Sequence, residues 1–258
     1  MSNYKIHSIV ALLLGFLFFQ NPIAIALTLI GANLPDNDHK IKKDNVYRLI
    51  ILGLLIFIAL YILKLPYYLG ILICLLGLIF YFSSHRGFTH SIFGILLISL
   101  ILFFIFKLTF TLILKLNFLT SLSNIKLISI SISIIFISLF SLNKKLIGPF
   151  IILFLLVLFF YHPIFNELII FLSIFLGLLS HILVDLFSPA GVKVFSPLSD
   201  KIYHKKFAII LIILIILLFI GYYTHYLLIF INFLKYYLFK KFYNLFNNLS
   251  YFVTIHLF

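Results

Sequence analysis

The chain has 258 residues, of which 64% are hydrophobic and only 10% charged, and its mean hydropathy is +1.28. Soluble domains are about half apolar and about a quarter charged, so this composition excludes a soluble domain and predicts an all-α, polytopic transmembrane bundle. The formal net charge of +13 comes from lysines scattered between apolar runs. That pattern favours the lipid bilayer and its anionic headgroups, and not nucleic acid, as the partner.

The first apolar segment is interrupted. Residues 8–19 and 23–32 are apolar, and Gln20-Asn21-Pro22 separates them. At about 1.5 Å per residue each piece is too short to cross a hydrocarbon core of ~30 Å. Either Pro22 kinks one spanning helix, which leaves His7 and Asp36 roughly 40 Å apart, or the break turns a helical hairpin that brings them together. We favour the hairpin.

Seven further apolar runs follow a polar loop at residues 33–45, and each is a candidate membrane helix. They lie near residues 47–63, 67–83, 91–114, 125–142, 146–161, 164–187 and 207–231. The tail 232–258 alternates aromatic residues with Lys and Asn, which is typical of an interfacial helix or a poorly formed last span. We expect one membrane-embedded domain over residues 1–231 and a separate C-terminal helix over 232–258.

Counting these crossings places three polar loops on one membrane face. Run 47–63 leaves the side of Asp36 and run 67–83 returns, and the next two pairs of runs do the same. The loop that holds Asp36, the loop that holds His85 and the loop that follows Asp185 therefore lie on the same side of the membrane. With the hairpin, twelve of the 19 Lys and Arg residues lie on that side and seven on the other. The positive-inside rule then predicts a multi-pass protein of the cytoplasmic (inner) membrane whose site faces the cytoplasm.

The loop Leu34-Pro35-Asp36-Asn37-Asp38-His39 holds two of the six acidic residues of the chain. Pro35 ends the preceding helical pattern and presents the carboxylates in a loop. The same residues are also ordinary turn chemistry. Asp36 and Asp38 are candidate metal ligands or general bases, and His39 is a candidate ligand beside them.

A second stretch, Ser84-His85-Arg86-Gly87-Phe88-Thr89-His90-Ser91, opens the next long helix. Thr89 or Ser91 can cap that helix, and its positive end can attract an anion. His85 and His90 are candidate metal ligands, although contact with lipid headgroups is the ordinary alternative. Arg86 has the planar fork that suits a phosphate or another oxyanion, although positive-inside topology alone would also explain it.

The third stretch carries His181 and Asp185, four residues apart on an apolar helix. This spacing puts both side chains on one face, where they can hold one metal ion. Asp185 lies in the last turn before Pro189, where the helix dipole disfavours a carboxylate unless a cation is near. The alternative is a solvated Asp beside a core His.

One explanation, a shared metal site, covers all three stretches if they lie close together in the folded protein. Several carboxylates close together at a membrane repel one another, and divalent cations would neutralise them. The single cysteine, Cys74, lies inside an apolar run, so a cysteine-based site is excluded. We expect a divalent metal held by His and Asp, with zinc as the metal. His7 joins the site only if the hairpin forms; otherwise it is an interfacial anchor.

The order of these motifs resembles the YdjM family of membrane-bound, metal-dependent hydrolases, which are also described as LexA-binding and are distantly similar to zinc-dependent phospholipase C and P1-type nucleases. The resemblance rests on His7, Leu34-Pro35-Asp36-Asn37-Asp38-His39, His85-Arg86-Gly87-Phe88-Thr89-His90-Ser91 and His181 to Asp185 with Pro189-Ala190-Gly191. It implies a membrane hydrolase with a His/Asp metal centre. The matching positions are His7, Asp36, Asp38, His85, His90, His181 and Asp185, with His39 and Arg86 as companions.

Together, residues and resemblance predict a membrane-bound hydrolase of a phosphoester, which includes phospholipid-like substrates because the site lies at headgroup depth. Asp36 or Asp38 would act as general base and Arg86 would steady the phosphate oxygens. The runner-up is a non-enzymatic membrane anchor that binds a soluble regulatory protein. A transporter is disfavoured, because it would need ionisable residues within several membrane helices.

Overall fold

The computed structural model describes residues 4–39, 42–116, 125–160 and 166–255. The chain divides into two units, residues 1–210 and 211–258, and each is considered by itself. Within the described residues there are nine α-helices, two short 3₁₀ helices and no strand longer than the single bridge between Val192 and Tyr203. The predicted all-α transmembrane fold is therefore confirmed.

The helices follow the apolar runs of the sequence to within a few residues, except that the last helix continues well beyond residue 231, to Ile255. Their bounds are α1 Tyr4–Phe18, α2 Pro22–Asn33, α3 Lys43–Ile62, α4 Tyr68–Phe82, α5 Ile92–Lys115, α6 Ile125–Ser141, α7 Lys144–Phe160, α8 Glu167–Leu186 and α9 Lys205–Ile255. The 3₁₀ helices η1, Pro35–Asp38, and η3, Phe88–His90, carry two of the three polar motifs.

The N-terminal hairpin is present. Asn21 caps α2 by accepting a hydrogen bond from the Ile23 amide at 3.0 Å, and Pro22 occupies the first helical turn, where it needs no hydrogen bond. The open ends of the hairpin are joined by Asn33 Nδ2, which donates to Ser8 Oγ at 3.1 Å. As a result His7, at the start of α1, lies next to the loop that follows α2.

Helices α2 and α8 cross at two glycines, which bring their backbones into direct contact. A Cβ at Gly31 would lie 2.7 Å from the Ile174 carbonyl oxygen, and a Cβ at Gly177 would overlap the Thr28 carbonyl oxygen. Small residues at such crossings let membrane helices approach closely. This crossing fixes the C-terminal end of α2, and therefore η1, against the C-terminal half of α8.

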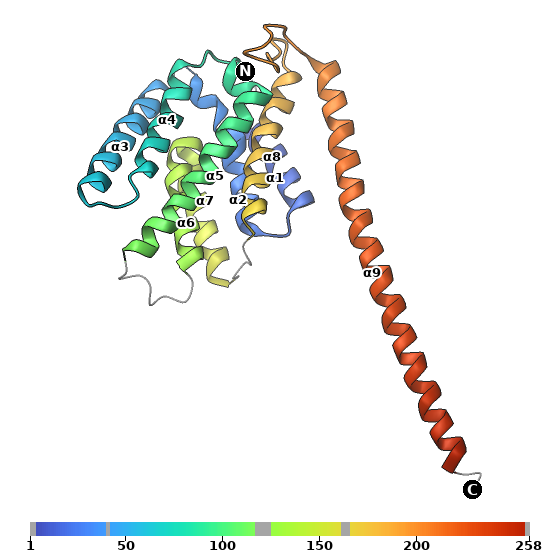
Figure 1. Ribbon diagram of the computed structural model, residues 1–258. Helices are drawn as coiled ribbons and strands as arrows, with labels where there is room; N and C mark the ends of the chain where they lie inside the picture. The colour runs from blue at the N-terminus through green and yellow to red at the C-terminus, as the bar shows by residue number, and fades with distance from the viewer. Residues whose placement is uncertain (1–3, 40–41, 117–124, 161–165, 256–258) are drawn as a thin grey trace. The chain divides into compact units, whose positions relative to one another are not determined.

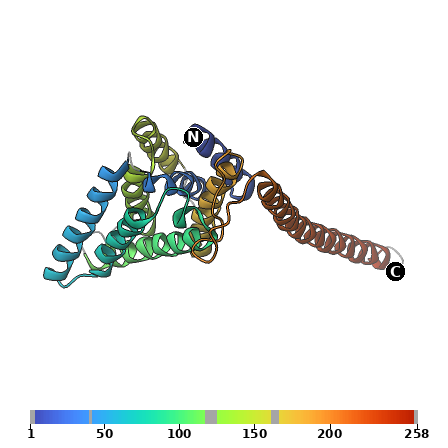
Figure 2. The ribbon, with the colours of Figure 1, turned by 90° about the horizontal axis from the view of Figure 1, so that it is seen from above.

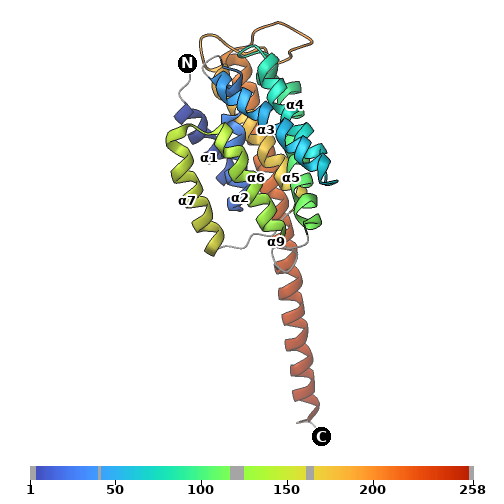
Figure 3. The same ribbon diagram turned by 90° about the vertical axis from the view of Figure 1, so that its left-hand side faces the viewer.

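Helices α1, α5, α6 and α7 pack directly against this pair. Figures 1 and 2 show α3 and α4 running side by side as a hairpin, with α5 next to α4, and Figure 3 shows α7 at the edge of the bundle beside α6. In the part of the chain that the structure describes, four helices are long and apolar enough to cross a membrane: α3, α5, α8 and residues 205–225 of α9. Helices α1, α4 and α6 are apolar but shorter, with 15, 15 and 17 residues.

The loops that carry the polar motifs lie at one end of the bundle. Figure 1 shows the α2–α3, α4–α5 and α8–α9 connections together at its upper end, whereas the α1–α2 turn and the α3–α4 turn lie at the other ends of these helices. Backbone contacts join two of these loops directly: the Ile92 amide donates to the Val194 carbonyl at 2.9 Å. The expected agreement of the three loops on one face is therefore observed.

Helix α9 continues without interruption through the tail. Its 51 residues correspond to about 77 Å, more than twice the thickness of a bilayer core. The tail 232–255 is thus helical, as both alternatives for it required. The division of the chain at residue 231 stays a prediction.

Candidate metal centre

Asp38 accepts hydrogen bonds from both histidines of the α4–α5 loop. Its Oδ1 lies 2.8 Å from His85 Nδ1, and its Oδ2 lies 3.2 Å from His90 Nδ1. Thr89 donates its hydroxyl to the same Oδ2. Burial raises the pKa of Asp38, but the hydrogen bonds from His85, His90 and Thr89 outweigh it and hold the pKa well below the usual range. Asp38 is therefore an ionised carboxylate that orients two imidazoles.

The α4–α5 loop is shaped so that these side chains converge. Arg86 has a positive φ of 62°, which turns the chain between His85 and Gly87. Ser91 caps α5, accepting from the Gly94 amide at 3.0 Å and donating to the Phe88 carbonyl at 2.7 Å. Of the two capping candidates, Ser91 is therefore the N-cap of α5, and the Thr89 hydroxyl instead donates to Asp38.

His181 and Asp185 extend from one face of α8, as their spacing predicts. The His181 Nδ1–H donates to the Ala32 carbonyl at 2.6 Å, which leaves Nε2 as an acceptor. This Nε2 lies 3.1 Å from His90 Nε2 and 3.5 Å from Asp185 Oδ2, and His90 Nε2 lies 3.4 Å from the same Oδ2. Three potential ligand atoms from two distant segments therefore form a small triangle.

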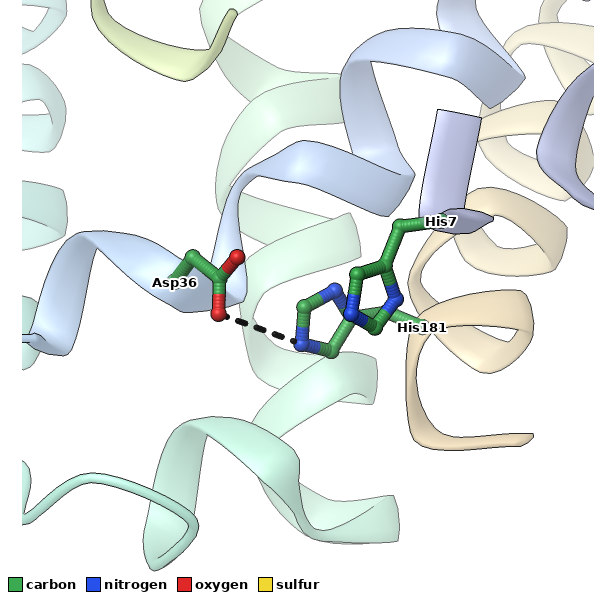
Figure 4. Close-up of side chains that lie close together, drawn as sticks. All are labelled: His7, Asp36 and His181. Atoms are coloured by element: carbon green, nitrogen blue, oxygen red, sulfur yellow. Dashed lines mark ion pairs between the residues drawn. The ribbon is translucent and has the colours of Figure 1, made fainter. Parts of the chain in front are cut away.

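His7 and Asp36 approach this triangle from the hairpin side. The His7 ring stacks on His181 with a centroid distance of 4.0 Å, and His7 Nε2 lies 3.7 Å from Asp185 Oδ1. Asp36 Oδ1 lies 3.7 Å from His181 Nε2, as the dashed line in Figure 4 shows. Possible ligand atoms of His7, Asp36 and His181 lie within 4.8 Å of one another, and so do those of Asp36, His85 and His90.

Arg86 ties the α4–α5 loop to the end of α8. Its guanidinium donates to Ser188 Oγ at 2.7 Å and lies 3.5 Å from Asp185 Oδ1. Ser188 in turn donates to the Asp185 carbonyl at 2.7 Å. The cation thus stands beside the cluster and compensates part of its negative charge.

Burial divides the site into a floor and a mouth. His7, His90, His181 and Asp185 are buried. Asp36 and His85 reach the surface, with 25% and 32% of their side chains exposed, and Arg86 retains 16%. Asp36, His85 and Arg86 are therefore the members of the cluster that contact solvent.

The donor set fits a divalent cation. Two ligands of a tetrahedral metal, each ~2.0–2.1 Å from the ion, are roughly 3.3–3.4 Å apart, and the triangle of His90, His181 and Asp185 has sides of 3.1, 3.4 and 3.5 Å. The site also holds three carboxylates, with the Arg86 guanidinium beside Asp185 and the Lys42 ammonium near Asp36 and Asp38. If both rings are neutral and donate from Nδ1, their Nε2 lone pairs face each other across 3.1 Å, an arrangement that a cation between them would stabilise.

Almost all residues proposed from the sequence meet here. His7, Asp36, His85, His90, His181 and Asp185 supply groups of atoms that could hold a metal, among the residues that the structure describes. Asp38 binds the Nδ1 atoms of His85 and His90, and Arg86 lies beside Asp185 Oδ1. His39 is peripheral: its ring packs edge-on against His85 at 4.8 Å and lies outside those groups.

Four groups that hold the site residues in place were not predicted from the sequence. They are the Ala32 carbonyl behind His181, the Thr89 hydroxyl on Asp38, Ser188 beside Arg86, and the Ser8–Asn33 hydrogen bond that closes the hairpin. Thr89 could have been noticed from its position next to His90. The main-chain carbonyl of Ala32 has no signature in sequence.

A family model matches nearly the whole chain. The family model described as YdjM inner membrane protein matches residues 1–142 and 146–254. No curated protein and no solved structure matches the chain.

Proposed function

Because this chain belongs to the YdjM inner membrane protein family, we propose that it is an inner-membrane, metal-dependent hydrolase that cleaves a phosphoester on the cytoplasmic side. Zinc is the metal we propose, since it binds imidazole and carboxylate donors, and the spacing of these three donors matches one face of a tetrahedron. The His90–His181–Asp185 triangle, extended by His7 and His85, would hold it, which leaves Asp36 free of the metal.

One observation carries the proposal: the contact of 3.1 Å between His90 Nε2 and His181 Nε2. Each of these rings gives its other nitrogen to a fixed acceptor, Asp38 or the Ala32 carbonyl. Such an outer hydrogen bond typically selects the tautomer of a metal-binding histidine. In these tautomers two neutral imidazoles would turn lone pairs toward each other, and a cation between them would stabilise that contact.

The chemistry of the site follows from its charges. A divalent metal, when bound, would supply an activated water and would stabilise negative charge on the reacting group. Asp36, the most exposed carboxylate of the cluster, would serve as the general base. The Arg86 guanidinium has the fork geometry to hold phosphate oxygens, and it is aligned by Ser188 and Asp185. Asp38 is occupied by His85 and His90, so we assign it to positioning and not to proton transfer.

The substrate class is a phosphoester for two reasons. The mouth of the site combines a fixed cation, Arg86, with metal-binding groups, which suits an anionic tetrahedral phosphate. It also lies at the end of the helices, at the level of lipid headgroups, so a phospholipid-like molecule could present its phosphate there without leaving the membrane.

The test uses the purified full chain. Elemental analysis should find a divalent metal, and turnover on a panel of soluble and lipid phosphoesters should disappear on chelation and return with zinc. Asp36→Asn should abolish turnover while metal is retained, and His204→Ala, which removes an imidazole outside the cluster, should leave both unchanged. Absence of any metal-dependent turnover, with retention of a soluble protein partner, would establish the membrane-anchor alternative instead.

A further inference from the structure

A second site lies away from the metal centre, in an open groove between α3 and α6. Its volume is about 420 Å³, which is within the ~300–1,000 Å³ of small-molecule pockets. None of its lining residues belongs to the metal centre, so the inference below does not rest on the proposed hydrolase activity.

The groove is polar at one end. Asn45 and Arg48 line it, and both lie in the first two turns of α3, at the end of the bundle that carries the polar loops. Arg48 is exposed and forms no ion pair within the described residues, although Asp44 lies four positions earlier. A cation and an amide at headgroup depth can bind a phosphate group.

The rest of the groove is apolar. Leu52 and Leu55 continue the same face of α3, and Leu139 and Phe140 come from the last turn of α6. The ten helical rises from Asn45 to Leu55 span about 15 Å along α3, which is half of the ~30 Å hydrocarbon core. The groove therefore has the depth of one lipid leaflet.

We propose that this groove binds one anionic phospholipid of the leaflet on the side of the metal centre. The phosphate lies on Arg48 and Asn45, and one acyl chain runs along Leu52 and Leu55 against α6. The polar end and the one-leaflet depth argue for a lipid over a transmembrane helix of another protein, because a spanning helix would need an apolar face along the full core.

The experiment measures lipid retention by native mass spectrometry on the delipidated full chain. Phosphatidylglycerol is the probe, phosphatidylcholine is the neutral comparison, and glycerol 3-phosphate is the soluble competitor. Arg48→Gln should weaken phosphatidylglycerol binding about fivefold, the effect of one interfacial cation. Lys43→Gln, which removes the same charge on another face of the first turn, should change it less than twofold.

Two further arms separate the outcomes. Leu139→Trp, which fills the apolar end, should also weaken binding, and Asp185→Ala should leave it unchanged even if it removes metal. Equal retention by the Arg48→Gln and Lys43→Gln variants would overturn the proposal. So would displacement by glycerol 3-phosphate, which would indicate a phosphate site without a lipid groove. Circular dichroism on each variant checks that the helical fold is intact.

Discussion

At the scale of single residues, the centre depends on Asp38 as much as on the atoms that face the metal. Its two oxygens accept from His85 and His90 separately, so one carboxylate sets the tautomer of two imidazoles. An amide in its place offers only one acceptor oxygen. One imidazole would then lose the partner that directs its Nε2 into the site.

We therefore expect Asp38→Asn to lower metal affinity by about 10–100-fold, the typical effect of removing an outer hydrogen-bond partner of a ligand. Competition with a chelator of known affinity measures it. Asp44→Asn, at an exposed position in the first turn of α3, is the matched control. If both variants bind metal equally well, Asp38 has no positioning role.

A second prediction at this scale tests whether the three loops form one site. His85 lies near the surface and Asp185 at the floor, yet both contact the same ion-binding region. His85→Ala should therefore lower bound metal as severely as Asp185→Ala. Elemental analysis per mole of protein measures this, with His204→Ala as the imidazole control. Full metal content in either of the first two variants would separate the loops into unrelated sites.

The sequence predicts which residues meet but not which atoms. His181 and Asp185 could be paired from their spacing alone, and the helix count brought His85 and His90 to them. That Asp38 faces Nδ1 atoms, while Asp36 faces Nε2 atoms, depends on the turn of η1 between them. The position of His39 beside His85, outside the ligand groups, has the same origin. Such orientations arise from local backbone geometry, which two alternating Asp residues do not encode.

At the scale of elements, the crossing of α2 and α8 determines whether the site can form. The Ala32 carbonyl, one residue after Gly31, holds the His181 ring, so the two helices must stay in contact. Gly177 permits this contact because the Thr28 carbonyl occupies the space of a Cβ.

Gly177→Ala should therefore lower the free energy of unfolding by about 1–3 kcal/mol, the usual cost of overpacking, and weaken metal binding as α2 moves off α8. Gly148→Ala in α7 is the control, since a Cβ there has nothing within 4 Å; replacing a helical Gly by Ala should raise stability by ~0.5–1 kcal/mol. Thermal unfolding followed by circular dichroism suits a chain without tryptophan. A Gly177→Ala protein as stable as Gly148→Ala would show that the crossing is loose.

The helices themselves were predictable because apolar runs in this sequence are bounded by polar or proline-containing breaks. The hairpin was the harder case, since Pro22 is compatible with a kink as well as a turn. The decisive contact, Asn33 to Ser8, joins residues 25 apart and could not be read from either run. The glycine contacts between helices could not be predicted either, because the sequence alone does not say which helix packs against a given glycine.

At the scale of the whole molecule, the orientation in the membrane follows from charge. The three polar loops lie at one end of the bundle (Figure 1), and the count of crossings from the sequence assigns the larger share of the Lys and Arg residues to that side. Cationic loops are retained on the cytoplasmic side, so the metal centre should face the cytoplasm and the α3–α4 turn should face the opposite compartment.

Single cysteines in a Cys74→Ser background test this orientation, because Cys74 is the only natural thiol. Asp200→Cys, in the exposed part of the α8–α9 loop, and Lys64→Cys, in the exposed α3–α4 turn, report on the two ends. A membrane-impermeant maleimide should label Lys64→Cys in intact cells and Asp200→Cys only after permeabilisation. The two positions are separated by the length of α3, so one must be protected wherever the other is accessible. The reverse pattern would place the centre outside the cytoplasm, and any phosphoester that it hydrolyses would then have to come from that side.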